Sequence, residues 1–217
     1  MSAGSQAWGI DLAIASTATL IRRCLHLFPP DWRLLRSTEP PDERVIRRQG
    51  MVEIREVPGA FAAETCVKGE PHMARKTALR RLANYVGGDN RGGLHLRTRR
   101  PVTQRFDASG RWRVRVLLPD MTGARAALIA RGGKVRLGQV APETLAVVRA
   151  PGYPTAQRVE RGEAAILDAI AGAAWTVTGP AMIRLHSPPR SRVLGGWFEV
   201  ALPVRPAEAD GSGYFTK

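Results

Sequence analysis

The feature that most constrains the fold of this chain is an alternation of apolar and charged residues with a period of two. In the stretch RWRVRVLLP, every second residue from Trp112 to Leu118 is apolar, and Arg111, Arg113 and Arg115 occupy alternate positions. In an extended strand these two sets lie on opposite faces, so the pattern predicts an antiparallel strand with one buried face and one basic, solvated face. Similar runs predict further strands at residues 51–57, 59–67, 135–140, 144–149, 175–185 and 197–204.

Helical spacing of apolar residues occurs in two segments of the same region. Residues 73–86 place Leu79, Leu82 and Val86 on one face of a helix, and residues 155–171 carry a stripe of the same kind. Apolar residues three and four positions apart share one side of a helix, which is the side that packs on a core. The chain is therefore predicted to be mostly sheet, with two helices.

These two helices occupy equivalent places in two similar stretches of sequence. Pro58 in the first stretch corresponds to Pro142 in the second, and Leu82 corresponds to Leu167 at almost the same offset. Any two amphipathic helices that follow strands show some likeness, and this is the alternative explanation. We favour a degenerate duplication, which predicts an α+β fold of two strand-helix-strands halves. Together the halves would form a twisted antiparallel barrel-like sheet flanked by two helices, with a cleft where helix and sheet meet.

The length of 217 residues and the hydrophobic content of 44% suit one domain with loose ends. We expect residues 1–45 to be an N-terminal extension, with an amphipathic helix and a proline-rich linker, residues 46–205 to be the folded domain, and residues 206–217 to be a flexible tail. The apolar stretch at residues 10–21 is shorter than the roughly 20 residues that a bilayer requires. Its helix would dock on the domain, or bind a membrane surface or a partner.

The charge of the chain favours anionic partners. The formal net charge is +14 and the pI is about 11.3, mostly because of arginine. Nucleic acid, acidic lipid or a carboxylate-bearing small molecule would all suit this balance. Cys24 and Cys66 are too few for a disulfide framework or a zinc cluster, and the segment at the N-terminus lacks the pattern of a secretory signal. A cytoplasmic location is the expectation.

A glycine-rich turn after the first helix carries a resemblance to a known family. The segment LANYVGGDNRGG is followed by RPVTQ at residues 100–104, and later by HSPP and FEV. This order and spacing resemble the SOUL/haem-binding protein family, from about Met51 to Val204 and most specifically from Tyr85 to Pro101. Where that family has a small apolar segment, this chain has LRTRRP, and where it has polar residues near the C-terminus, this chain has GGWFEV.

The resemblance implies a barrel-like α+β domain that binds haem or protoporphyrin without covalent attachment and without one obligatory axial histidine. A porphyrin needs a broad apolar surface, cations for its propionates and, for tight iron binding, an imidazole or thiolate. The helix at residues 73–86 and the loop HSPPRSRVLGG are the segments that the resemblance selects. The candidate ligand-binding residues are Lys76, Leu79, Arg80, Leu82, Val86, His95, His186, Arg190 and Arg192.

Each candidate also has a structural explanation. The apolar residues would pack in the core, the basic residues would form a solvated face, and His95 and His186 would have surface or structural roles. Catalytic motifs are absent from the sequence, and Glu199 alone makes no acid/base pair, so we expect a binding protein and no enzyme. Two other hypotheses remain: an accessory subunit that docks on an acidic protein or membrane surface, and nonspecific nucleic-acid binding. The first would use the N-terminal helix and the cluster Arg97, Arg99 and Arg100.

Overall fold

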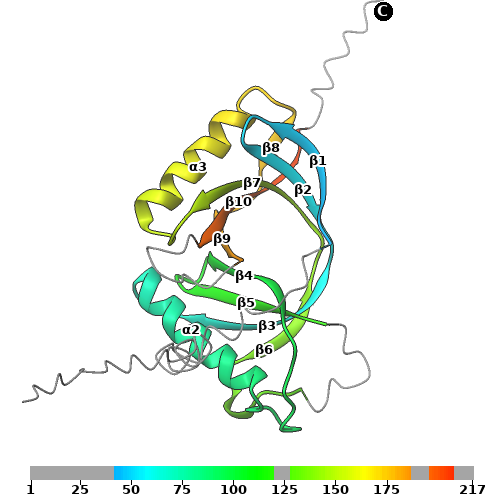
Figure 1. The fold of residues 1–217 in the computed structure, drawn as a ribbon, viewed down its shortest axis with the longest axis vertical. Helices are drawn as coiled ribbons and strands as arrows, with labels where there is room; N and C mark the ends of the chain where they lie inside the picture. Colours follow the sequence, from blue (N-terminus) through cyan, green and yellow to red (C-terminus); the bar gives the residue numbers. More distant parts are fainter. Residues whose placement is uncertain (1–41, 120–127, 187–195, 208–217) are drawn as a thin grey trace, which may run out of the picture.

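The computed structural model describes residues 42–119, 128–186 and 196–207 (Figure 1). Among these residues lie two α-helices and ten β-strands, which together form a curled, half-barrel sheet with helices against it. The elements in chain order are β1 (Arg44–Gln49), β2 (Val52–Val57), β3 (Ala60–Val67), α2 (Pro71–Val86), β4 (Arg99–Phe106), β5 (Trp112–Leu118), the 3-10 turn η3 (Arg131–Gly133), β6 (Arg136–Val140), β7 (Glu143–Pro151), α3 (Ala156–Ile170), β8 (Trp175–Val177), β9 (Met182–Leu185) and β10 (Trp197–Pro206).

The strand order shows the duplication directly. The sheet runs β1-β2-β7-β10-β9-β4-β5-β3-β6, with all of its pairs antiparallel and β8 paired to β10. From the central β9–β4 pair outward, each side of the sheet repeats one order: β9, β10, β7, β2 on one side and β4, β5, β3, β6 on the other. The first strand of each sequence half pairs with the other half, since β2 joins β7 and β6 joins β3.

The predicted fold class is therefore confirmed: an α+β domain made of two strand-helix-strands halves. The correspondence seen in the sequence holds in the structure as well. Shifting the start of β2 by the number of residues that separates Pro58 from Pro142 gives the start of β6. Shifting the start of α2 by the number that separates Leu82 from Leu167 gives the start of α3. The two halves meet at the register pairs Val102–Leu185 and Gln104–Ile183.

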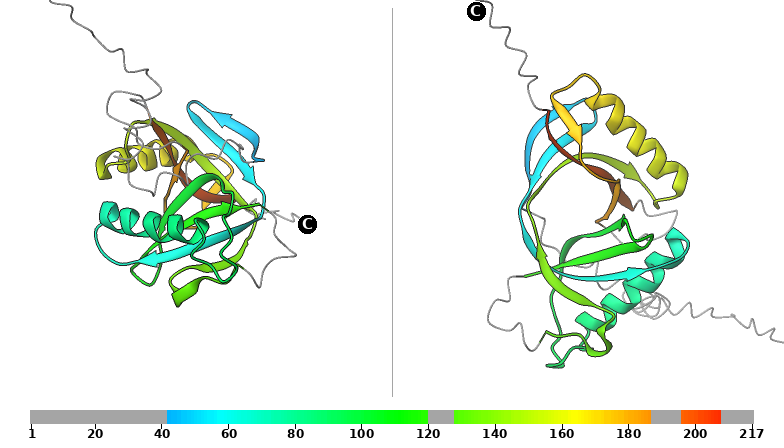
Figure 2. Two further views of the ribbon diagram at one scale, coloured as in Figure 1. Left: turned by 60° about the horizontal axis from the view of Figure 1, so that its bottom comes forward. Right: turned by 180° about the vertical axis from the view of Figure 1, so that it is seen from behind.

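Both helices pack against the same side of the sheet, as the two views of Figure 2 show. Helix α2 contacts β3 and β5, and α3 contacts β7 and β10. The main core lies between helices and sheet, and combines Leu79 and Leu82 of α2 with Ile166 and Ile170 of α3. Helix α3 approaches the sheet closely at Gly162, where a Cβ atom would lie 2.7 Å from a methyl carbon of Val200. This approach requires glycine.

The opposite face of the sheet is mostly polar. Its small apolar cluster comprises Leu145, Val147, Met182 and Ala201. Around this cluster the same face carries charged side chains from both halves, which pair across neighbouring strands. Arginines thus alternate with valines along β5 as the sequence predicts, but Arg113 pairs with Asp107 and Arg115 pairs with Glu64.

The strand boundaries differ from the sequence expectation at three places. Residues 175–185 form two strands, β8 and β9, because Gly179 and Pro180 separate them. Strand β4 is not among the strands that alternation predicts, since RRPVTQRF lacks apolar alternation. Strand β1 begins at Arg44, two residues before the expected start of the domain, and it was missed because most of its residues are exposed at the edge of the sheet.

Candidate ligand-binding site

Helix α2 ends in a turn that Asn90 organises. The side chain of Asn90 is fully buried, and its amide nitrogen donates hydrogen bonds to the carbonyl oxygens of Tyr85 (3.0 Å) and Leu94 (2.7 Å). Its oxygen accepts a hydrogen bond from the Leu94 backbone N–H (2.8 Å). Gly88 has a φ of 113°, which glycine adopts readily. The glycines of the sequence motif therefore shape the turn, and the asparagine holds it closed.

A surface pocket of about 530 Å³ lies beside this turn. The Leu96 backbone N–H donates to the Val86 carbonyl oxygen (2.8 Å), and this bond fixes the chain after the turn against the end of α2. The volume is within the usual range of small-molecule sites, roughly 300–1,000 Å³. The lining residues are Ala83, Asn84, Val86, Gly87, Asp89, His95, Leu96 and Thr98.

The structure separates the helix candidates into two groups. Lys76 and Arg80 are exposed on the outer side of α2, whereas Leu79 and Leu82 are 3% and 0% exposed and belong to the core. Both leucines pack against apolar core side chains, so ordinary packing accounts for them. Val86 also packs on the core, but it lines the pocket. The apolar contact predicted for the whole helix is thus available at its C-terminal end.

The two candidate histidines lie in different settings. His95 is exposed and lines the pocket beside Val86. His186 is 5% exposed, its Nε2 lies 2.7 Å from a carboxylate oxygen of Glu199, and its ring stacks on Trp197 with ring centroids 4.3 Å apart. An iron ion at Nε2 of His186 would have to displace Glu199. Of the two residues, His95 has the ring that a pocket-bound ligand can reach.

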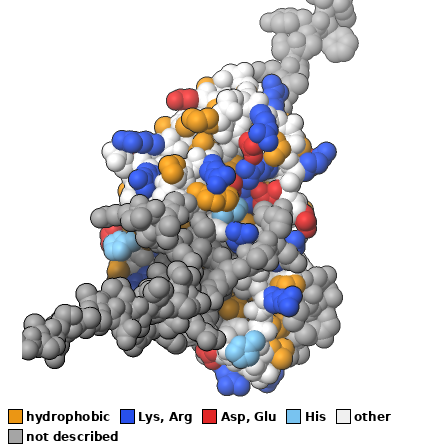
Figure 3. All heavy atoms as spheres, viewed as in Figure 1, with side chains coloured by type: hydrophobic (Ala, Val, Ile, Leu, Met, Phe, Trp, Pro, Cys, Tyr) orange, Lys and Arg blue, Asp and Glu red, His pale blue; other side chains and the backbone are white. Residues whose placement is uncertain are grey.

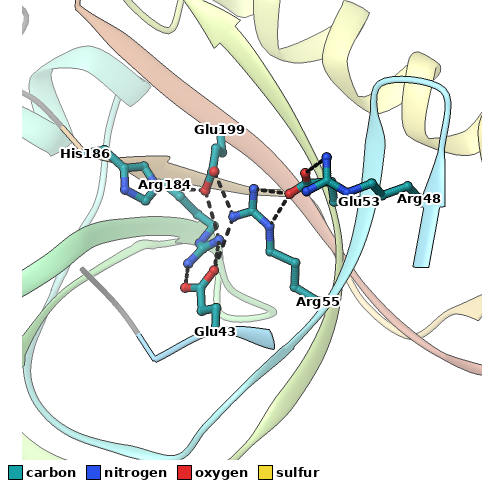
Figure 4. A network of polar contacts seen from close by, with 7 residues as sticks. All are labelled: Glu43, Arg48, Glu53, Arg55, Arg184, His186 and Glu199. Carbon is teal, nitrogen blue, oxygen red and sulfur yellow. Dashed lines mark hydrogen bonds and ion pairs between the residues drawn. The ribbon is translucent and has the colours of Figure 1, made fainter. Parts of the chain in front are cut away.

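His186 belongs to a network of buried charges on the face of the sheet opposite the helices (Figure 4). Glu199 accepts hydrogen bonds from Arg55 (2.9 Å) and Arg184 (2.9 Å). Arg184, which is 1% exposed, also pairs with Glu43, and Arg55 lies 3.2 Å from the same carboxylate. Glu43, the residue just before β1, therefore forms an ion pair with Arg184 of β9, a strand at the centre of the sheet.

The network holds Glu199 in its charged form. Burial alone would raise the pKa of Glu199, but the hydrogen bond with His186 and the charges of Arg184 and Arg55 lower it to about 2. A carboxylate that stays ionised with three partners has no free proton to exchange near neutral pH. The arrangement is suited to structural support of the sheet.

The arginine cluster of the sequence is partly engaged inside the domain. Arg97 is exposed, but Arg99 donates to Asp42 (2.9 Å) and Arg100 donates to the carbonyl oxygen of His186 (2.9 Å). In Figure 3 basic side chains are spread over the described surface in view and do not gather in one patch. Docking of the cluster on an acidic surface stays a prediction, with Arg97 as its most accessible member.

Several predicted features lie outside the described residues: Arg190, Arg192 and the N-terminal helix. Among the residues that the structure does describe, no helix is long and apolar enough to cross a membrane. The same residues contain no cluster of three or more histidine, cysteine, aspartate or glutamate side chains that would hold a metal ion.

Two buried arginines were missed from the sequence, although each had a signal. Arg184 interrupts the apolar run of β9, so a buried strand with one charged residue indicated a partner. Arg75 precedes Leu79, Leu82 and Val86 by 4, 7 and 11 positions, so helical spacing puts it on their buried face. Arg75 is indeed 3% exposed.

With fold and pocket described, comparison with known proteins identifies the class. This duplicated α+β half-barrel matches the SOUL heme-binding protein family over residues 38–195, and the chain belongs to that family. The resemblance predicted from the sequence is confirmed. No curated protein sequence matches the chain.

Solved structures share the fold at low identity. The C-terminal domain of EcmrR has a TM-score of 0.56 and 12% identity over 72% of this chain and 98% of that one. A hydrolase from Listeria innocua has a TM-score of 0.52 and 14% identity over 74% of this chain and 94% of its own. At these identities the similarity shows the fold alone.

Proposed function

We propose that this protein binds a haem or porphyrin non-covalently at the C-terminal end of α2, as a buffer or carrier and not as an enzyme. Membership of the SOUL heme-binding protein family is the observation that carries the proposal. The pocket supports it, because it combines the two candidates Val86 and His95 with the further apolar residue Leu96. We also propose that the protein works in the cytoplasm.

The residues around the pocket fit a porphyrin. Ala83, Val86 and Leu96 offer apolar surface for a flat ring, and His95 offers an imidazole for an iron. Arg80 precedes the pocket residue Asn84 by one helical turn and Lys76 precedes it by two, which is about 6 and 12 Å along the axis. Both cations are exposed, so they would receive propionate groups at the edge of the ring.

In this proposal the residues of the chain divide the work of binding. The apolar side chains exclude water from one face of the ring, the two cations orient its carboxylates, and Asn90 keeps the turn in place. A bound haem would supply an iron centre that accepts a nitrogen ligand. The protein contributes the position of the ligand and an apolar surface for it.

Titration of the full chain with haemin and with iron-free protoporphyrin IX tests the proposal. We expect saturable binding of both at micromolar concentration, seen as a shift of the Soret band. His95→Ala should alter the Soret position and affinity of haemin but leave protoporphyrin IX unchanged, because only the iron needs the imidazole. Absence of saturable binding of either compound by the wild-type protein would refute the function.

Variants of matched chemistry test the location. Leu96→Glu should weaken both ligands at least tenfold, whereas Leu167→Glu, on the exposed side of α3, should not. Replacement of Lys76 and Arg80 by Gln should weaken binding about tenfold, since loss of about 1.4 kcal/mol corresponds to one decade. Arg161→Gln on α3 is the control. Equal loss in control and test variants would place the ligand elsewhere.

A further inference from the structure

The N-terminal ends of α2 and α3 lie near each other on one side of the sheet (Figures 1 and 2). Tyr153, two residues before the N-cap Thr155 of α3, places its ring centroid 5.1 Å from the guanidinium carbon of Arg75 in α2. Neither helix has an acidic residue in its first turn. The free N–H groups at a helix N-terminus carry partial positive charge, so both ends favour an anion.

Arg75 adds a full positive charge at this place. Its side chain is 3% exposed, and its Nε donates a hydrogen bond to Gln104 of β4. Gln104 is fully buried and donates in turn to the carbonyl oxygen of Pro71 (3.1 Å), so the guanidinium is held in position. The Nη1 atom is buried with no hydrogen-bond acceptor, and no carboxylate within the described ranges pairs with Arg75. Burial lowers the pKa of Arg75, and the charge interaction and side-chain hydrogen bond with Tyr153 partly offset that effect.

The other charged groups near the two helix ends do not neutralise Arg75. Glu70, the N-cap of α2, is exposed and makes no side-chain capping bond. Arg158, in the first turn of α3, donates to the carbonyl oxygen of Tyr153 (3.2 Å) and adds another positive charge. A buried charge without a counter-charge destabilises a fold, so packing alone does not explain Arg75.

We propose that Arg75 anchors a binding site for the carboxylate group of a small organic acid, between the N-termini of α2 and α3 and beside the ring of Tyr153. The unused Nη1 can donate a charge-assisted hydrogen bond to one oxygen of a carboxylate. The site differs from the pocket at the other end of α2, because the helix from Arg75 to Val86 spans roughly 16 Å. It therefore does not depend on the porphyrin proposal.

Thermal unfolding of the full chain tests the site with acetate as the probe. Sodium acetate should raise the midpoint temperature in a saturable way, relative to sodium chloride at the same ionic strength. At ten times the dissociation constant, the expected rise for a domain of this size is about 3–6 °C. If acetate and chloride give the same curve, the site does not exist. If phosphate stabilises and acetate does not, the carboxylate assignment is wrong.

Two variants locate the effect. Arg75→Met should abolish the response to acetate, and without acetate it should unfold at no lower temperature than the wild type, because it removes an uncompensated buried charge. Arg161→Met, on the exposed side of α3, should keep the response. A response that survives Arg75→Met, or that Arg161→Met abolishes, would overturn the proposal.

A measurement on the wild-type protein covers the case in which Arg75→Met fails to fold. The guanidinium N–H groups of a buried arginine exchange slowly enough to be followed by proton–nitrogen NMR. Arg75→Lys, which keeps the charge, would assign the resonance by its loss. Acetate should shift the Arg75 signal with the same midpoint as the thermal series. An unmoved Arg75 signal at a saturating acetate concentration would refute the site.

Discussion

The buried carboxylate of Glu199 makes the stability of this domain sensitive to acid in a way that can be calculated. Its side chain is 2% exposed and contacts Arg55, Arg184 and His186. The pKa of Glu199 is lowered from 4.5 to about 2. A group whose pKa is depressed in the folded state contributes stability that is present above its unfolded pKa and is lost as pH falls through its folded pKa. The window here is thus between pH 5 and pH 2.

The magnitude follows from these two pKa values. Going from pH 6 to pH 3 should cost about 2 kcal/mol through Glu199 alone, because the unfolded chain binds the proton and the folded chain hardly does. Glu199→Gln removes the titrating group. At pH 6 it should destabilise the fold by about 3 kcal/mol, since the arginines keep only their other partners. At pH 3 that difference should shrink to about 1 kcal/mol.

Urea unfolding of the wild type and of Glu199→Gln at pH 6 and pH 3 measures how the difference between their free energies of unfolding changes with pH. Glu56→Gln is the control for the loss of an ion pair, because Glu56 pairs with Arg44 at the exposed edge of the sheet. Exposed pairs contribute about 0–1 kcal/mol, so this variant should unfold almost like the wild type at pH 6. If the difference in the free energy of unfolding between the wild type and Glu199→Gln is the same at pH 6 and pH 3, the partners of Glu199 do not lower its pKa in the folded state, and the prediction is wrong.

Two further predictions concern positions that hold the site and the sheet. Asn90→Ala should lower the free energy of unfolding by roughly 3 kcal/mol, because three hydrogen bonds are lost in a buried turn, whereas Asp89→Ala beside it should change little in the same urea assay. Glu43→Gln should destabilise the domain by about 3 kcal/mol. Combined with Glu199→Gln in a double-mutant cycle, it should deviate from additivity by at least about 0.5 kcal/mol, because both carboxylates contact Arg184. Additive effects would mean that the two carboxylates act independently.

The duplicated fold was predictable because its signal is repeated along the whole chain. Period-two alternation marks the strands whose two faces differ, such as β5, and helical spacing marks α2 and α3. Strand β4 gave no such signal, since its buried Gln104 is polar and Pro101 breaks the pattern. Its strand conformation comes from pairing with β5, the next strand along the chain, and with β9, which lies beyond α3. Local sequence carries no trace of that pairing.

The site was predictable only in part, for a similar reason. The resemblance selected α2 and the segments that follow it, and the structure brings Val86 and His95 to one pocket across the glycine-rich turn. Helical spacing does not show how deeply a stripe of side chains is buried, so the sequence left Leu79 and Leu82 either at a ligand surface or in the core, and both lie in the core. Depth depends on which side of the sheet the helix covers, and that is set by long-range packing.

Each face of the sheet at the central β9–β4 pair holds a buried arginine, and the two arginines differ in their partners. On one face Arg184 is buried, and both Glu43 and Glu199 neutralise it, so its cost is offset within the domain. On the other face Arg75 is buried to a similar extent, is held by Gln104 of β4, and has no carboxylate partner among the described residues. In the proposal above, Arg75 is held in position for the carboxylate of a ligand, as Arg184 is held for Glu43 and Glu199.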